Sequence, residues 1–312
     1  MNPKISIKVM GIGGAGGNAV DRMMQCKVAG VELIAVNTDA QDLKKIQAHK
    51  KIQLGKESTR GLGAGMNPET GRKAALESRE ELAGSLKGAD LVFLTAGLGG
   101  GTGGGAIPVI AEIAKSQGAL VVAVVTKPFS FEGAWRARLA QNALQELEGK
   151  VDTLLSIPND QILKIAGPDT TVLSAFWKAD EVLREAVQGI SDLIALPGIV
   201  NVDFADLKGL MKNAGRAVFG VGYGKGEKRM DTALGAALHS PLLTVSLKGA
   251  KGVLFNVAGS DDLSLNEIQE VAQKIRQEAS PSAKIIFGAA YDRNLKQGEA
   301  KLTVIATGFE GE

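Results

Sequence analysis

The stretch ADLVFLTAGLGGGTGGGAIP, residues 89–108, joins an apolar run directly to a loop that carries three glycines on each side of Thr102. A short apolar run bounded by glycine is typical of a buried strand that ends at a turn. Glycine amides with no Cβ in the way can form a concave anion site, and the positive end of a helix starting near Ala106 would point at it. The sequence therefore predicts that the amides of Gly99–Gly105 bind phosphate groups, because close packing of a helix on the sheet explains only one or two of these glycines.

Similar apolar runs alternate with helical patterns through the first half of the chain. They occupy residues 6–12, 31–37, 119–126 and 151–158. Runs that are apolar on both faces and separated by helices describe a parallel sheet covered on both sides. We therefore expect a doubly wound parallel-sheet α/β domain over residues 1–170, which binds its ligand beyond the carboxyl ends of the strands.

A long helical pattern and a second set of strands follow. The pattern predicts a central connecting helix over residues 171–200, apolar on several sides and ended by Pro197 and Gly198, as expected of a helix packed between two bodies. Over residues 201–312 the chain has strand-like runs at 216–224, 239–247, 251–259, 283–292 and 301–309, and helical segments at 229–239 and 264–279. This mixture predicts a second, α+β domain.

Composition and charge narrow the range of partners. The 312 residues carry 36 Lys and Arg against 34 Asp and Glu, scattered along the chain, so no basic face indicates a nucleic acid or an anionic membrane. No apolar run is long enough to span a bilayer and the first residues lack the features of a signal peptide, so we expect a cytoplasmic protein with no direct membrane insertion. The single cysteine, Cys26, excludes an internal disulfide and a cysteine-based zinc cluster, and we expect it in the core.

A second glycine-rich loop follows the first predicted strand. Gly11, Gly13 and Gly16 satisfy the G-x-G-x-x-G pattern of dinucleotide binding, with Asn37 or Asp39 as the group for the ribose. Taken alone, this pattern predicts an NAD-dependent oxidoreductase of the Rossmann class. Such an enzyme needs one glycine loop at its first strand, however, and not a denser one further along. Two loops favour a polyphosphate held by both, and neither contains the Gly-Lys-Ser/Thr of a Walker A loop.

Two more segments bring polar groups to the same edge of the predicted sheet. Glu132 and Arg136 lie one helical turn apart after the strand at 119–126, where they can bond a ribose, a phosphate or a base, or form a surface ion pair. Asn159 follows the strand at 151–158, where it can cap a helix or reach the ligand. Spacing alone does not choose between these alternatives.

Seven segments together resemble a known family. GGAGGNAV (13–20), NTDAQDL (37–43), TRGLGAGMNPETG (59–71), GLGGGTGGGAIPV (97–109), TKPFSFEG (126–133), SIPNDQIL (156–163) and NVDFADLK (201–208) occur in the order and spacing of the tubulin/FtsZ GTPases. The likeness covers nearly the whole chain and is strongest to the bacterial cell-division filament proteins of that family.

The resemblance implies a site for GTP or GDP. The residues that it places around the phosphates are Gly13, Gly14, Ala15, Gly16, Asn18, Ala64, Gly65, Met66, Gly97, Gly99, Gly100, Gly101, Thr102, Gly103, Gly104 and Gly105. Those that it places on the nucleoside are Asn37, Glu132, Arg136, Asn159, Phe176 and Asp180. Phe176 matches the ring that packs on guanine, and Asp180 matches the carboxylate that reads guanine N1 and N2, which excludes adenine.

The sequence departs from the family pattern at two of these loops. Gly104 stands where the family usually has a second threonine, so one hydroxyl is missing from the phosphate cradle and the loop is expected to be looser. Ala134 stands where the family often has a basic residue. From the change at Gly104 we expect nucleotide affinity or turnover to differ from the family's.

The catalytic carboxylates are expected in NVDFADLK. Asp203 and Asp206 share one face if a helix begins there, although Asn201 and Asp203 can also be plain helix caps. If Asp180 touches guanine, the rest of the long helix carries the chain roughly 25 Å away, so these carboxylates cannot reach their own nucleotide. The resemblance assigns Asp203, Asp206 and the adjacent Asn201 to the neighbouring subunit's GTP. Head-to-tail contact that does not close gives an open filament.

Partners and alternatives follow from the same reading. We expect Mg²⁺ held mainly by phosphates and water, with no metal ligands from protein side chains. We also expect a homopolymer that acts at the division site. Its further partners are expected to be membrane anchors and regulators, although the C-terminal tail by which the family usually meets them does not follow in this chain. The alternatives are the oxidoreductase and a non-catalytic GTP-binding scaffold. The oxidoreductase needs an acid or base in the second domain, yet His49 and His239 have no evident catalytic partner and are expected to be structural.

Overall fold

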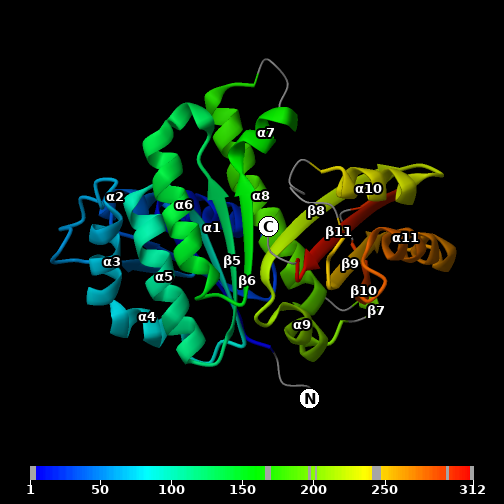
Figure 1. Ribbon diagram of the computed structural model, residues 1–312, viewed down its shortest axis with the longest axis horizontal. Coiled ribbons are helices and arrows are strands. Elements are labelled where there is room, and N and C mark those ends of the chain that lie inside the picture. The colour runs from blue at the N-terminus through cyan, green and yellow to red at the C-terminus, as the bar shows by residue number, and fades with distance from the viewer. Residues whose placement is uncertain are drawn as a thin grey trace. The chain divides into compact units, whose positions relative to one another are not determined.

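The computed structural model describes residues 5–165, 170–195, 198–200, 202–240, 247–292 and 295–309 (Figure 1). The chain divides into two compact units, Met1–Gln188 and Gly189–Glu312. The expected domain boundaries at 170 and 200 remain a prediction.

The first unit contains a parallel sheet of six strands in the order β3-β2-β1-β4-β5-β6. The strands are β1 (Ile7–Ile12), β2 (Val31–Asn37), β3 (Lys50–Gln53), β4 (Leu91–Gly97), β5 (Leu120–Lys127) and β6 (Thr153–Pro158). Five of them coincide with the apolar runs of the sequence. The short edge strand β3 was not predicted, because KKIQ contains a single apolar residue.

The helices of this unit are α1 (Gly13–Gln25), α2 (Ala40–Lys45), α3 (Pro68–Glu77), α4 (Arg79–Leu86), α5 (Gly101–Ser116), the 3₁₀ turn η1 (Ser130–Glu132), α6 (Ala134–Glu148) and α7 (Asn159–Ile165). Apolar side chains of α3, α4, α5 and α6 form one buried cluster with alternate residues of the strands. The remaining residues of the central strands are also fully buried, as Val9, Phe93 and Val122 illustrate. A sheet buried on both faces confirms the doubly wound parallel fold.

The strand order reverses direction between β1 and β4, which are paired from Ile7↔Leu91 to Ile12↔Ala96. In a doubly wound sheet this switch point opens a crevice at the carboxyl ends of the strands, where ligands bind. Both glycine-rich turns follow these two strands. The topology therefore brings the turns of residues 11–20 and 97–105 to one place.

The long helix α8 (Val172–Ala195) confirms the predicted connecting helix and spans the boundary between the two units. It is a single helix of 24 residues. The prediction of Cys26 as a core residue is wrong. Cys26 is exposed because α1 has already ended at Gln25.

The second unit contains a mixed sheet in the order β8-β11-β9-β10-β7. Its elements are β7 (Gly198–Val200), α9 (Phe204–Met211), β8 (Gly215–Lys225), α10 (Arg229–Leu238), β9 (Gly252–Gly259), α11 (Leu265–Glu278), β10 (Lys284–Tyr291) and β11 (Glu299–Thr307). β11 is antiparallel to β8 and β9, while β9 and β10 are parallel. The α+β prediction is thereby confirmed. The strand expected at 239–247 falls mostly outside the described residues.

Candidate functional site

Two helix N-termini meet at the switch point of the sheet. The N-caps of α1 and α5 are Ile12 and Gly100, neither makes a side-chain capping bond, and no acidic residue lies in either first turn. The first amides of a helix have no partner within the helix and carry partial positive charge. The two helices thus leave uncapped amides at one edge of the sheet, which is the arrangement that binds an anion.

The two turns approach each other so closely that only glycine fits at several positions. A Cβ on Gly97 would lie 2.7 Å from the Cβ of Ala15, and one on Gly13 would lie 3.3 Å from the amide nitrogen of Gly103. Gly13 also has a φ of +71°, in the left-handed region that favours glycine. The sequence-predicted residues of both loops are therefore brought together.

The glycine run plays a larger packing role than its sequence suggested. α5 begins at Gly101 and not near Ala106, so Thr102 and the three glycines after it belong to the first turns of a helix. A Cβ on Gly105 would lie 1.9 Å from the carbonyl oxygen of Pro68, and one on Gly103 would lie 2.5 Å from that of Gly97. Close approach of backbones thus requires more glycines than the one or two expected, while the amides of the helix start remain the candidate donors.

Gly104 is the exception in this run. A Cβ there would lie 3.5 Å from the Cβ of Ala143, an ordinary contact, and Gly104 is in a helical conformation. No steric reason in the described structure demands glycine at this position. A Cβ would fit at this buried position without displacing a neighbour.

A third segment joins the two turns. A Cβ on Gly101 would lie 2.8 Å from Ala64, and Gly65 and Met66 both have positive φ, +56° and +59°. The Thr38 and Thr102 hydroxyls are hydrogen bonded at 2.6 Å. This segment, Ala64 to Met66, therefore lies next to the start of α5, and its contact with phosphates remains a prediction.

The two candidates for a ribose group after β2 are engaged in local structure. The Asp39 carboxylate caps α2 by accepting hydrogen bonds from Gln41 and Asp42. Asn37 donates its side-chain amide to Asp42 at 2.9 Å and accepts from the Asp39 amide at 3.2 Å. Neither side chain stands free for a dinucleotide ribose in this structure.

The polar residues after β5 and β6 differ in their partners. Glu132 accepts from the Phe129 amide and from the Arg136 guanidinium, the latter at 2.6 Å, so the ion pair left open by the sequence is formed. Asn159 opens α7, is 5% exposed, and its Oδ1 is a buried acceptor with no hydrogen-bond partner among the described residues. A buried orphan acceptor favours a role toward a ligand over a cap.

Aromatic rings gather where α8 begins. Phe176 stands edge-on to Phe129 and Phe131, with ring centroids 5.2 and 6.5 Å apart. Phe176 is 39% exposed and Phe131 is 59% exposed. A partly exposed ring beside polar groups is suited to stack on a planar base.

One turn further along α8, Asp180 is buried beside α1. Burial raises the pKa of the Asp180 carboxyl to about 7, while the positive charge of Arg22 and a hydrogen bond from Asn18 act in the opposite direction. Arg22 Nε lies 3.9 Å from Asp180 Oδ2, and the Arg22 guanidinium lies over the Trp177 ring, 4.5 Å from its centroid. Sequence reasoning missed Arg22 and Trp177. The signal for Arg22 was its position one helical turn after Asn18, on the same face of α1.

The predicted catalytic carboxylates lie in the second unit. Asp203 is the N-cap of α9 and accepts from the Ala205 amide, so the capping alternative is realised in the structure. Asp206, in the first turn, forms an exposed ion pair with Lys284 at 3.2 Å. Asp203 is also exposed. Asn201 lies outside the described residues.

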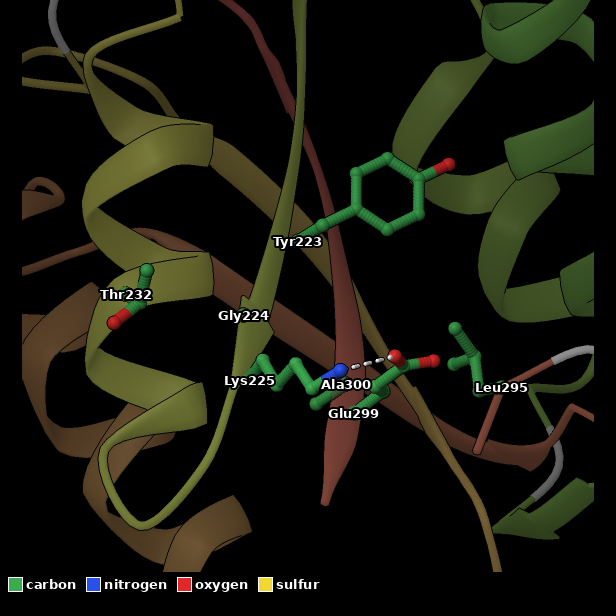
Figure 2. A pocket seen from close by; sticks show the side chains of 7 residues that line it. All are labelled: Tyr223, Gly224, Lys225, Thr232, Leu295, Glu299 and Ala300. Atoms are coloured by element: carbon green, nitrogen blue, oxygen red, sulfur yellow. Dashed lines mark ion pairs between the residues drawn. The ribbon is translucent and has the colours of Figure 1, made fainter. Parts of the chain in front are cut away.

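Other groups offer less chemistry. His49 accepts from the Leu33 amide through Nδ1, and His239 Nδ1 lies 3.0 Å from the Gly235 carbonyl, which fits structural roles. Figure 2 shows a hollow in the second unit that is lined by the paired strands β8 and β11, by Thr232 of α10 and by Leu295, and in which Lys225 and Glu299 form an ion pair at 3.4 Å. Because its two charged groups neutralise each other, this hollow lacks a free acid or base.

Within the described ranges, no three His, Cys, Asp or Glu side chains come together as a metal site would require. None of the helices in those ranges is long and apolar enough to cross a membrane.

Comparison with known proteins extends these findings. Residues 6–167 match the family model "Tubulin/FtsZ family, GTPase domain", and residues 215–310 match "FtsZ family, C-terminal domain". An FtsZ dimer from M. jannaschii is 46% identical, covers 99% of this chain and 89% of its own, and superposes with a TM-score of 0.94. A mutant FtsZ from the same organism gives 46% identity, 98% and 92% coverage, and a TM-score of 0.94. A GTPγS-bound protofilament of CetZ2 from Haloferax volcanii, at 22% identity, 98% and 94% coverage and a TM-score of 0.81, shares the fold.

Proposed function

The chain belongs to the tubulin/FtsZ family of GTPases, and from that premise we propose that it hydrolyses GTP at the contact between successive subunits of a head-to-tail filament. The observation that carries this proposal is the meeting of two uncapped helix N-termini, α1 and α5, at the switch point of the sheet. The family membership excludes the oxidoreductase that the first glycine motif alone would favour.

The phosphates of GTP bind at these helix starts. The α1 turn supplies Gly13, Gly14, Ala15, Gly16 and Asn18, the third segment Ala64, Gly65 and Met66, and the α5 turn Gly97 and Gly99 to Gly105. Support comes from the packing of the three segments and from the absence of capping side chains on α1 and α5. Amides at two helix N-termini favour a ligand with several negative charges.

The nucleoside occupies the side of the turns that faces α8. Asn159 provides a buried acceptor for it, and the paired Glu132 and Arg136 offer a carboxylate and a guanidinium. Phe176 stacks on the base and the Asp180 carboxylate accepts from guanine N1–H and N2–H. Adenine has no such donors, so Asp180 makes the site selective for guanine. We assign Asn37 only a supporting role, since its side chain is bonded to Asp42.

Mg²⁺ accompanies the phosphates. We expect the phosphates and water to supply most of its ligands. This donor set fits Mg²⁺, which keeps several waters and binds through phosphates. When bound there, the ion would supply positive charge to balance that of the phosphate groups.

Asp203 and Asp206 orient and polarise the attacking water. Both carboxylates are exposed at the start of α9, and Asp203 is fixed in place by its bond to the Ala205 amide. A carboxylate held in this way can accept a proton from water as it attacks the γ-phosphate. Asn201, beside them in the sequence, is assigned to the same task on the strength of the resemblance.

These carboxylates serve a neighbouring molecule. α8 runs unbroken from Asp180 to Ala195, a rise of roughly 22 Å at 1.5 Å per residue, before the chain reaches Asp203. The M. jannaschii relative is a dimer and the CetZ2 relative a protofilament. In a head-to-tail filament of this chain, one copy would place its α9 carboxylates over the GTP of the next, and assembly would complete the active site.

In the cell, we propose that the filament acts at the division site in the cytoplasm, with membrane anchors and regulators as partners. The units of the protein would then be a GTP-binding domain (1–170), a connecting helix (171–200) and a C-terminal polymerisation domain (201–312). The support is the match of residues 215–310 to the C-terminal domain of the FtsZ family, a family of cell-division proteins.

Phosphate release from GTP by an Asp206→Ala variant tests the proposal. We expect the variant to bind GTP as the wild type does while its turnover falls at least about a hundredfold, because one member of the water-activating pair is lost. Asp231→Ala is a matched control, since Asp231 also forms an exposed ion pair with a lysine, Lys274, in the same unit. Full turnover by Asp206→Ala would refute the assignment.

A further inference from the structure

Three side chains on α1 and α8 form a cluster at the guanine end of the proposed site. Arg22 of α1 lies between the Trp177 ring, 4.5 Å from its guanidinium carbon, and the Asp180 carboxylate, 3.9 Å from its Nε. The side chains of Arg22 and Asp180 are 19% and 11% exposed. Two opposite charges are thus held together with little solvent between them, where their interaction is strong.

Arg22 and Asp180 lie close enough to form an ion pair, but Arg22 Nε does not donate a hydrogen bond to the carboxylate. A distance of 3.9 Å is too long for a hydrogen bond, and Arg22 Nε is a buried donor without a hydrogen-bond partner in the described chain. A structural salt bridge would place the donor against the carboxylate oxygens. Here the guanidinium supplies positive charge and leaves those oxygens free to accept from another molecule.

The Trp177 ring explains why the guanidinium stays at this distance. A guanidinium over an indole face is stabilised by about 0.5–2 kcal/mol, depending on how far it is desolvated. Trp177 therefore competes with Asp180 for the charge of Arg22. The position of Arg22 near the end of α1, where a cation is favoured by the helix dipole, adds to this.

The surrounding charged groups do not replace Arg22. Arg184, one turn further along α8, bonds Glu181 and Gln188 on its own helix. The negative charge of Glu181 is thereby balanced by Arg184. Cys26, exposed just after α1, is the weakest of the groups that raise the pKa of Arg184. On the α1 side, Asp180 faces the neutral Asn18 and the charged Arg22.

We propose that Arg22 is a positioning residue for base recognition, holding the Asp180 carboxylate charged without donating a hydrogen bond to it from Nε, so that the carboxylate can accept from guanine. This inference rests on the proposed nucleotide site and adds a residue to it. A protonated Asp180 would meet the N–H groups of guanine with an O–H group and lose an acceptor. Binding of guanine below neutral pH is therefore coupled to loss of the Asp180 proton, and Arg22 lowers the pH at which that loss occurs.

The test is the dissociation constant of GDP at pH values from about 6 to 8.5, which spans the titration of a carboxyl with a pKa near neutrality. GDP is the probe because it carries the guanine base without hydrolysis. Its own phosphates titrate in the same range, so the readout is the difference between variants. For Arg22→Ala we expect a pH midpoint about one unit higher, hence binding about fivefold weaker at pH 7 and nearly tenfold weaker at pH 6, with affinity largely recovered at the upper end of the range.

Three variants sharpen the test. Arg22→Lys keeps a positive charge and should restore most of the midpoint, although not the planar stacking on Trp177. Trp177→Leu should weaken binding about two- to fivefold. Arg138→Ala is the matched control, because Arg138 stacks on Trp135 at a similar 4.4 Å but on an exposed surface, and it should leave the GDP affinity unchanged.

The outcomes separate the inference from the function beneath it. A pH midpoint for Arg22→Ala equal to that of the wild type, with binding weakened by one constant factor throughout, would assign Arg22 a purely structural role and overturn the inference. If Arg22→Ala does not fold, the same comparison is made with Arg22→Lys and Trp177→Leu. Wild-type protein that binds no GDP at any pH would refute the nucleotide site itself.

Discussion

Replacing Asp180 by asparagine should stabilise the nucleotide-free protein, although it removes the residue that reads guanine. Burial raises the pKa of the Asp180 carboxyl from its ordinary 3.8 to about 7. The folded state therefore holds a proton that the unfolded state loses, and the free energy of unfolding falls as the pH rises from about 4 to 7. A difference of about three pH units corresponds to about 4 kcal/mol, and that is the upper limit of the cost of a charged Asp180 above pH 7.

Asparagine has nearly the same shape and no charge, so it avoids this cost. We expect Asp180→Asn to raise the free energy of unfolding by roughly 2–4 kcal/mol at pH 8, but by no more than about 2 kcal/mol at pH 5, where the wild-type carboxyl is largely protonated. At pH values near 3 the two proteins should be equally stable.

Urea denaturation at these pH values measures the difference. The chain's two tryptophans, Trp135 and Trp177, both lie in the unit that contains Asp180, so their fluorescence follows its unfolding. Asp261→Asn, on an exposed turn of the other unit, serves as the control substitution. A stability gain for Asp180→Asn that is the same at pH 5 and pH 8, or a loss at pH 8, would show that burial does not strain this carboxylate and would refute the reasoning.

Three further changes follow from the packing and charges of the two units. Gly104→Thr should tighten GTP binding about three- to tenfold in an equilibrium binding assay, because one added hydroxyl bond is worth about 0.5–1.5 kcal/mol and the Cβ has room beside Ala143; weaker binding would show that the position needs glycine. Gly105→Ala should lower the free energy of unfolding by about 1–3 kcal/mol, measured by urea denaturation, since its Cβ would lie 1.9 Å from the Pro68 carbonyl oxygen. An unchanged urea midpoint would contradict this close approach. Hydrogen bonds from Ser260 and the Gly298 amide and the charge of Arg229 lower the pKa of the Asp262 carboxyl to about 2, so stability from this group is present above about pH 4 and lost as the pH falls toward 2. Acid titration of unfolding should show a weaker dependence in Arg229→Met, and an identical dependence would rule out the coupling.

Much of the fold could be predicted from the sequence because its strands are buried on both faces. Runs such as residues 119–125 are apolar at every position, so they identify parallel strands without knowledge of their partners. The edge strand β3 could not be found in this way, since only Ile52 of its four residues is apolar. Cys26 was misplaced because the helical pattern gave no sign that α1 would end one residue earlier.

The candidate site was predictable where backbone requirements decide the residue, and less so where distant side chains meet. The glycines of the two turns predict that the backbones of these turns lie close together. The sequence did not show that α5 starts at Gly101, or that part of the glycine run serves helix packing. In the cluster of Arg22, Trp177 and Asp180, side chains that are more than 150 residues apart in the sequence are in contact. Periodicity along one helix carries no information about such a partner, so only the tertiary structure reveals it.

The central claim, that the α9 carboxylates of one subunit act on the GTP of another, is tested most directly by mixing two inactive variants. Asp206→Ala retains its nucleotide site and lacks a water-activating carboxylate, whereas Asp180→Ala retains the carboxylates and lacks the guanine reader. With random co-assembly, verified by sedimentation, half of the subunits carry GTP and half of their neighbours carry Asp206, so an equal mixture should recover about a quarter of the wild-type phosphate release. A mixture that stays as inactive as its two components, although they co-assemble, would contradict catalysis between subunits.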